Sequence, residues 1–159
     1  MSIYFIDSSA LVKRYISEIG SQWVLDLFDP TLENDIFVAA ITGVEIVAAI
    51  TRRSRGGSIA DSDADTARNQ LKRDLKEEYQ VVQLLESILV SGMALAETHG
   101  LRGYDAIQLA AGCAINSLSI SNGLAPIIFV SADNYLNTAA MNEGLDIENP
   151  NQYPPNQYP

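Results

Sequence analysis

The sequence has almost no cysteine, with Cys113 as the only one among 159 residues. A single thiol cannot form an intramolecular disulfide, so a disulfide framework is excluded. Long apolar runs are missing as well, and none approaches the roughly 20 residues that span a bilayer. The N-terminus has no basic leader, and Asp7 interrupts its first apolar run. We therefore expect a cytoplasmic protein with neither a signal peptide nor a membrane segment.

Positive charge is also scarce. Lys and Arg total 10 against 20 Asp and Glu, which gives a formal net charge of -10, and every basic residue lies at or before Arg102. This balance opposes binding of nucleic acid to a broadly basic surface, because phosphates attract cations. A divalent cation held by carboxylates would offset part of the negative charge. The net charge therefore does not exclude an enzyme of nucleic acids.

Hydrophobic residues make up 47% of the chain, which is typical of one globular domain at this length. Short apolar runs predict buried strands at 3–6, 36–39 and 127–130, an edge strand at 145–147 and an ambiguous segment at 81–82. Helical spacing and capping residues predict helices after residue 8 and at 21–28, 42–53, 61–78, 84–98, 104–118 and 134–142. This alternation predicts an α/β fold with a parallel sheet that helices cover on both faces.

The last residues have a different composition. From Asn149 the chain is rich in Pro and Asn, and the tetrapeptide Asn-Gln-Tyr-Pro occurs at 151–154 and again at 156–159. Proline has no backbone N–H to donate, which disfavours helices and sheets. We therefore divide the chain into a domain over residues 1–148 and an extended or disordered tail over residues 149–159.

Four acidic residues lie at the ends of the expected elements: Asp7, Glu45, Asp105 and Asp133. Asp7 and Asp133 follow strands, and ligands of an open parallel sheet bind outside the carboxyl ends of its strands. Glu45 and Asp105 lie in the first turns of helices, near the same edge. Converging carboxylates repel one another unless a cation neutralises them. Hard oxygen ligands suit Mg²⁺ or Mn²⁺, so this pattern predicts a divalent-metal site.

Each acid also has a purely structural alternative. Asp7 and Asp133 can cap helices, and Asp105 can complement the dipole of its own helix. Glu45 can complete a capping box with Thr42. What favours the metal site is that all four acids lie where this fold class forms sites. The lone His99 stands apart from them, which disfavours zinc.

The same residues resemble the PIN-domain family, and within it the VapC-like ribonuclease toxins. Residues 6–15 are similar to the first family motif, and Glu45 stands where the family has a glutamate on a helix. Residues 101–110 are the most specific match, and residues 129–136 resemble the last acidic motif. The resemblance extends over roughly residues 1–148.

This resemblance implies a PIN-like three-layer α/β/α fold and a metal-dependent endoribonuclease. It also implies a toxin of a toxin–antitoxin pair, with RNA as substrate, an antitoxin that occludes the site, and a homodimer. The implied catalytic and metal-binding residues, for Mg²⁺ or Mn²⁺, are Asp7, Glu45, Asp105 and Asp133. Side chains that would orient them by hydrogen bonding are Ser8 and Ser131. Candidates for contacts with RNA phosphates are Lys13, Arg14, Arg52 and Arg53.

Two other functions stay open on the sequence. The first is a non-catalytic PIN-like module that binds a protein or RNA, which the four intact acids disfavour. The second is a metal-dependent phosphatase of another α/β family. A haloacid-dehalogenase-like enzyme requires a second aspartate two residues after the first, and Ser9 stands there instead.

Overall fold

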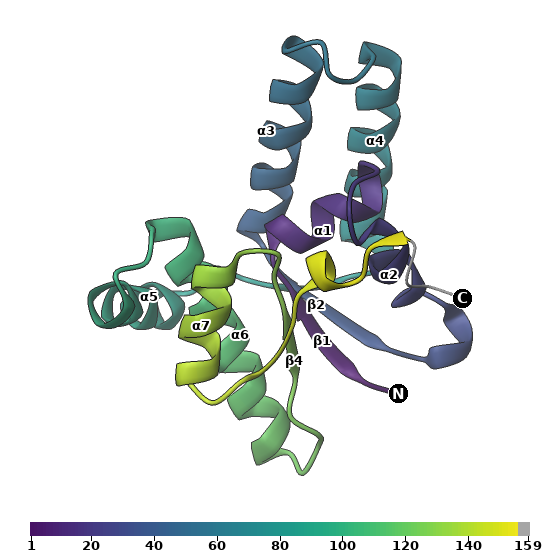
Figure 1. The fold of residues 1–159 in the computed structure, drawn as a ribbon. Coiled ribbons are helices and arrows are strands. Elements are labelled where there is room, and N and C mark those ends of the chain that lie inside the picture. The colour runs from purple at the N-terminus through teal and green to yellow at the C-terminus, as the bar shows by residue number, and fades with distance from the viewer. Residues whose placement is uncertain (156–159) are drawn as a thin grey trace.

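Five short parallel strands form the centre of the molecule in the computed structural model, which describes residues 1–155 (Figure 1). They are β1 (Ile3–Ile6), β2 (Asp35–Ala39), β3 (Gln80–Val82), β4 (Ile128–Val130) and β5 (Asp146–Glu148), in the order β3-β2-β1-β4-β5. The strands expected from apolar runs are confirmed. The ambiguous segment is the edge strand β3, which pairs with β2.

Side chains of the central strand alternate between two hydrophobic cores. Phe5 of β1 is buried in one core with Phe129 of β4, while Ile6 is buried in the other. Because successive strand residues point to opposite faces, such a strand must be apolar throughout. This double burial explains why the strands read as short continuous apolar runs.

Helices cover both faces of the sheet, as expected. Side chains of one core come from α1 (Ser8–Tyr15), α2 (Ser21–Asp26), α3 (Ile41–Arg55) and α4 (Asp61–Glu77). Those of the other come from α5 (Glu86–His99), α6 (Gly103–Ser121) and α7 (Asn134–Asn142). Figure 1 shows α3 and α4 as a hairpin that projects away from the sheet. Within residues 1–155, no helix has both the length and the apolar character needed to cross a membrane.

Close packing of α6 on the sheet depends on a small residue at one position. A Cβ atom added to Gly112 would lie 2.8 Å from the ring of Phe129. That ring stacks on Phe5 with 5.6 Å between centroids, so it has little freedom to move aside. Gly112 therefore lets α6 approach the sheet closely, which brings the start of this helix, with Asp105, to the carboxyl edge of the strands.

The expectation of an extended or disordered tail is wrong for residues 149–153. A short 3-10 helix, η2 (Pro150–Gln152), follows β5, and Tyr153 stacks on Trp23 of α2 at 4.8 Å between ring centroids. Gly20 makes this possible because its φ is +84° and a Cβ there would lie 2.2 Å from the Pro150 carbonyl oxygen. The last four residues of the expected tail, 156–159, lie outside the described residues.

Removing the Tyr153 ring should destabilise the protein. Tyr153→Ala removes the stack on the buried Trp23 and the hydrogen bond to Glu148 (2.8 Å). We expect a loss of about 1–3 kcal/mol in the free energy of unfolding, measured in urea, with a red-shifted Trp23 emission. Tyr153→Phe keeps the ring and should lose less. An alanine variant as stable as the wild type would show that the tail does not contribute to the core.

Candidate active site

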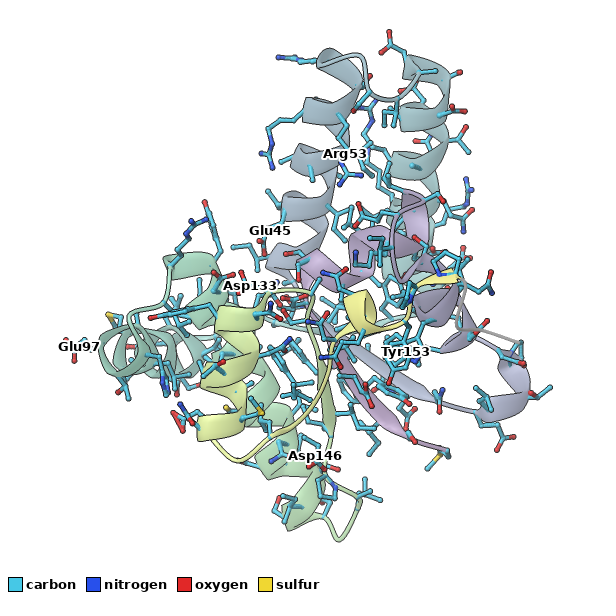
Figure 2. All side chains as sticks on the ribbon, viewed as in Figure 1. Glu45, Arg53, Glu97, Asp133, Asp146 and Tyr153 are labelled. Atoms are coloured by element: carbon cyan, nitrogen blue, oxygen red, sulfur yellow. The ribbon has the colours of Figure 1, made fainter. Side chains whose placement is uncertain are left out.

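The site lies where the strand order reverses. From β1 the chain continues to β2 and β3 on one side of the sheet centre, and then returns to β4 and β5 on the other side. Ligand sites of open α/β sheets form at such a switch point, beyond the carboxyl ends of the strands. Asp7 directly follows β1, and its backbone N–H donates to Val130 O of β4 at 3.0 Å. Figure 2 shows Asp133 at the start of α7 and Glu45 on α3 at this end of the sheet.

Asp7 is the most buried of the four acids, with 2% of its surface exposed. Its Oδ1 accepts hydrogen bonds from Ser9 Oγ (2.7 Å) and from the N–H of Ala10 (3.0 Å), and its Oδ2 accepts from Ser131 Oγ (2.7 Å). Burial raises the pKa of Asp7 to about 6, because desolvation outweighs these three donors. The charge of Asp105 raises the pKa further. Asp7 thus caps α1 and also presents a carboxylate to the site.

Glu45 is held from two sides. Ser8 Oγ donates to its Oε2 at 3.0 Å, and Gln108 Nε2 donates to its Oε1 at 2.9 Å. The capping box with Thr42 is not formed, because helix α3 begins at Ile41 and the Thr42 hydroxyl accepts from Gln108 at 2.9 Å. The structural alternative for this residue is therefore wrong. Glu45 instead links α3 to α1 and α6.

Asp133 and Asp105 complete the acidic group. Asp133 caps α7, since its Oδ1 accepts from the N–H of Leu136 at 2.9 Å. The Asp105 carboxylate receives no hydrogen bond within residues 1–155. Partial burial raises the pKa of Asp105, the nearby charges of Asp133 and Glu45 raise it further, and Arg102 opposes the rise. Asp105 is thus the carboxylate whose charge interacts with those of all three other acids.

A cleft of about 600 Å³ opens beside these acids. Glu45 and Asp105 line it together with Ser8 and Ser9. Its other walls are largely apolar and come from α1, α3 and the start of α6. A substrate can therefore reach Glu45 and Asp105 from solvent, while Asp7 is buried and does not line the cleft.

The described part of the chain contains no group of three or more Asp, Glu, His or Cys side chains already close enough to enclose a metal ion. The acids interact through their charges instead, Asp7 with Asp105, and Asp105 with Glu45 and Asp133. Their chemistry nevertheless suits a hard divalent cation. All donors are carboxylate oxygens, and Mg²⁺ needs only one or two of them, because it keeps several waters.

Three of the four basic residues expected at the site are engaged elsewhere. Lys13 is buried and pairs with Glu18 at 3.0 Å, and Arg53, labelled in Figure 2, pairs with Glu18 at 2.8 Å. Arg14 lies over the Phe28 ring, 3.8 Å from its centroid. It also forms an ion pair with Glu78, the residue that directly follows α4. Only Arg52 lines the cleft. The sequence does not show which of these basic residues are ion-paired, because the pairing depends on which segments are neighbours in the fold.

Sequence reasoning missed Ser9 and Gln108. Ser9 Oγ donates to Asp7 and accepts from the N–H of Ala132 at 3.0 Å, so it joins the β1 and β4 loops. Gln108 is 1% exposed and donates to both Thr42 and Glu45. A signal for Gln108 existed. It is a polar residue on an apolar, Ala-rich helix, three positions after Asp105 and so on the same helical face.

Comparison with known proteins identifies the fold family. Residues 4–134 match the family model of the PIN domain. The chain belongs to the PIN-domain family. The match spans all four acids, and the parallel sheet with helices on both faces agrees with a PIN-like α/β/α fold. A comparison with curated protein sequences gives no match.

Solved structures support the PIN fold over nearly the whole chain. The crystal structure of PAE2754 from Pyrobaculum aerophilum has a TM-score of 0.60 at 21% identity, covering 92% of this chain and 83% of that one. A toxin–antitoxin complex from Klebsiella pneumoniae gives 0.57 at 15%, covering 92% and 97%. VapBC2 from Rickettsia felis, bound to a DNA fragment from its promoter, gives 0.58 at 14%, covering 92% and 98%. At these identities the likeness concerns the fold.

The raised pKa of Asp7 predicts a pH dependence of the metal-free PIN domain. Below about pH 4, Asp7 is protonated in both the folded and the unfolded state. Between about pH 4 and 6 the folded state keeps a proton that the unfolded chain has lost, so the free energy of unfolding falls as pH rises. The total loss is about 3 kcal/mol, from a pKa of about 6 against 3.8.

Asp7→Asn should therefore flatten urea-unfolding stability between pH 4 and 6 in the presence of chelator, and should be more stable than the wild type at pH 7. Some slope remains, because the pKa of Asp105 is raised as well. Asp146→Asn, which changes an exposed carboxylate on β5, is the matched control and should follow the wild type. Parallel profiles for Asp7→Asn and wild type would contradict the burial cost assigned to Asp7.

Proposed function

We propose that this PIN-domain protein is a cytoplasmic endoribonuclease that depends on Mg²⁺ or Mn²⁺ and forms the toxin component of a toxin–antitoxin pair. One observation carries the proposal. Asp105 on α6 interacts through its charge with Asp7 after β1, Glu45 on α3 and Asp133 at the start of α7, at the topological switch point, and Glu45 and Asp105 line an open cleft there. The burial of Asp7 and the repulsion of Asp105 by neighbouring carboxylates cost free energy in the absence of a cation. A bound divalent cation would offset that cost.

The residues divide the proposed work between them. Asp105, which has no hydrogen-bond donor within residues 1–155, and Glu45 face the cleft and would hold the metal together with Asp7 and Asp133. The metal would activate water and stabilise negative charge on the phosphodiester. Ser131 and Ser9 keep the Asp7 carboxylate in one orientation, while Ser8 and Gln108 do the same for Glu45. Such support is needed because a ligand that rotates freely binds metal weakly.

The experiment that tests this proposal is cleavage of a mixed pool of structured RNAs by the purified protein, with Mg²⁺, with Mn²⁺ and with chelator. We expect metal-dependent cleavage that falls on the order of 10²-fold or more in Asp7→Asn and Asp105→Asn, because each removes a negatively charged oxygen donor. Asp63→Asn, on the exposed start of α4, is the control and should cut like the wild type.

Thermal melting separates a lost site from a lost fold. At a metal concentration 100 times the dissociation constant, the wild type should gain about 2.7 kcal/mol of stability, and Asp105→Asn much less. If the two variants cut RNA as well as the wild type, the assigned site is wrong. If the wild type neither cuts RNA nor gains stability with metal, the non-catalytic binding module is the better account.

A protein partner is part of the proposal. Two of the structures with the same fold are a toxin–antitoxin complex and VapBC2, which supports an antitoxin for this chain. A second copy is supported by α5, which buries only Ile88 and Gly92 although its central residues 87–96 carry no charge. Its exposed apolar side chains include Leu89, Val90 and Met93. Two copies of a protein with a net charge of -10 repel each other where their acidic surfaces meet. The apolar face of α5 carries no charge, so two copies can pack these faces together without that repulsion.

The homodimer can be tested through Met93, which is 64% exposed on α5. We expect sedimentation equilibrium to show a dimer for the wild type and a monomer for Met93→Glu, because a buried unpaired carboxylate opposes association. Met141→Glu is the matched control, since Met141 is 52% exposed on α7. A wild-type monomer, or equal effects of the two substitutions, would argue against dimerisation through α5.

A further inference from the structure

One exposed aromatic residue lines the cleft without a hydrogen bond or a stacked ring partner among residues 1–155. Tyr104 is 62% exposed, and its hydroxyl has no hydrogen-bond partner within residues 1–155. It lines the cleft directly beside Asp105. Tyr135 is a useful contrast at 63% exposure, because its hydroxyl donates to the His99 carbonyl at 2.7 Å and so ties α7 to the end of α5. Tyr104 makes no such contact within the described residues, so its ring is available to a ligand of the cleft.

One cation in the cleft is equally uncommitted. Arg52 is exposed and makes neither an ion pair nor a hydrogen bond through its guanidinium within the described chain. Arg53, its neighbour in sequence, is paired with Glu18, and Arg68 is paired with Asp65. An unpaired guanidinium in an otherwise acidic protein attracts an anion, and its planar fork suits the oxygens of a phosphate.

The spacing along α3 places this cation on the same side of the helix as Glu45. Arg52 is seven residues after Glu45, which is two helical turns and about 10 Å along the axis. Ala48 and Ala49 lie between them and also line the cleft. Their small side chains leave open space between Glu45 and Arg52. On the far side, Tyr104 and Asp105 come from the start of α6. The cleft therefore combines largely apolar walls with the Tyr104 ring, the Arg52 guanidinium and two carboxylates.

We propose that Tyr104 and Arg52 form a nucleotide subsite for single-stranded RNA next to the carboxylates. Tyr104 stacks on a base adjacent to the phosphodiester that is cut, and Arg52 binds a neighbouring phosphate of the same strand. This inference rests on the proposed nuclease function and states how its substrate is held. Stacking requires an unpaired base, so the subsite selects single-stranded RNA over duplex RNA.

The acidic character of the protein strengthens this assignment. With a net charge of -10, nonspecific attraction to RNA is weak, so binding must depend on a few defined contacts. Seven of the ten basic residues lie on the α3–α4 hairpin. Of these seven, only Arg52 lines the cleft that contains Glu45 and Asp105.

The test is the binding of a fluorescein-labelled short single-stranded RNA, followed by fluorescence anisotropy. Every variant is made in the full-length Asp7→Asn protein, so that cleavage does not interfere, and binding is measured with Mg²⁺ at several salt concentrations. We expect Tyr104→Ala to weaken binding roughly 10-fold and Tyr104→Phe to keep it, since the aromatic ring and not the hydroxyl stacks on the base. Arg52→Gln should weaken binding and lower the slope of log K against log salt by about 1.

Two matched controls and one modified RNA identify the contacts. Tyr135→Ala and Arg73→Gln remove an equally exposed ring and an exposed guanidinium on α4, both outside the cleft, and should leave affinity unchanged. With an RNA that lacks bases at successive positions, the effect of Tyr104→Ala should disappear at the position whose base stacks on the ring. Melting temperatures near that of the Asp7→Asn parent show that each variant is folded.

The failure of this inference is distinguishable from a failure of the nuclease function, because wild-type cleavage of the same RNA is measured in parallel. Metal-dependent cleavage together with unchanged affinity in Tyr104→Ala and Arg52→Gln would overturn the subsite and leave the nuclease intact. Equal losses in Tyr104→Ala and Tyr135→Ala would overturn it as well. Absence of both cleavage and binding by the wild type would overturn both, and would leave the cleft as a surface for a protein.

Discussion

The buried carboxylate of Asp7 is the interaction on which the site depends. It ends β1, caps α1 and accepts the hydroxyl of Ser131, which follows the neighbouring strand β4. Its donors Ser9 and Ser131 also contact the backbone N–H groups of Ala132 and Asp133. One charged group thus fixes the two loops at the switch point relative to each other. Burying a charge is costly even with such donors, as the pKa of about 6 shows, and a bound cation would offset that cost.

The other acids depend on this arrangement through the helices that carry them. Ser8, on the first turn of α1, reaches Glu45 on α3, and Gln108 on α6 reaches it from the opposite layer. Glu45 is therefore positioned by elements from both faces of the sheet. The cleft beside it stays open because α3 presents two alanines there, and α6 can approach the sheet because Gly112 has no side chain. Small residues shape this site as much as charged ones do.

Most of the fold, and the positions of two of the four acids, could be predicted from hydrophobic patterning and from the ends of strands and helices. Asp7 and Asp133 could be placed because both follow strands, and strand ends can be recognised from local sequence. Both side chains do cap helices, and this capping role does not exclude the proposed metal site. Glu45 was less certain, because a glutamate three positions after a threonine fits a capping box. Only the contacts of Ser8 and Gln108, distant in sequence, exclude that interpretation.

The sequence alone determined the layer order, the parallel sheet and the residue types at its carboxyl edge, because all three follow from local periodicity and from the short range of strand and helix signals. The tertiary structure decided which charges are available. Lys13, Arg14 and Arg53 looked equivalent to Arg52 along the chain, yet acidic partners from other segments hold all three. The tertiary structure also orders residues 149–153. Their composition suggests disorder, but Tyr153 stacks on an aromatic ring of α2. The pairs Arg14–Glu78 and Arg53–Glu18 and the stack of Trp23 on Tyr153 join residues far apart in sequence, so composition and spacing do not specify them.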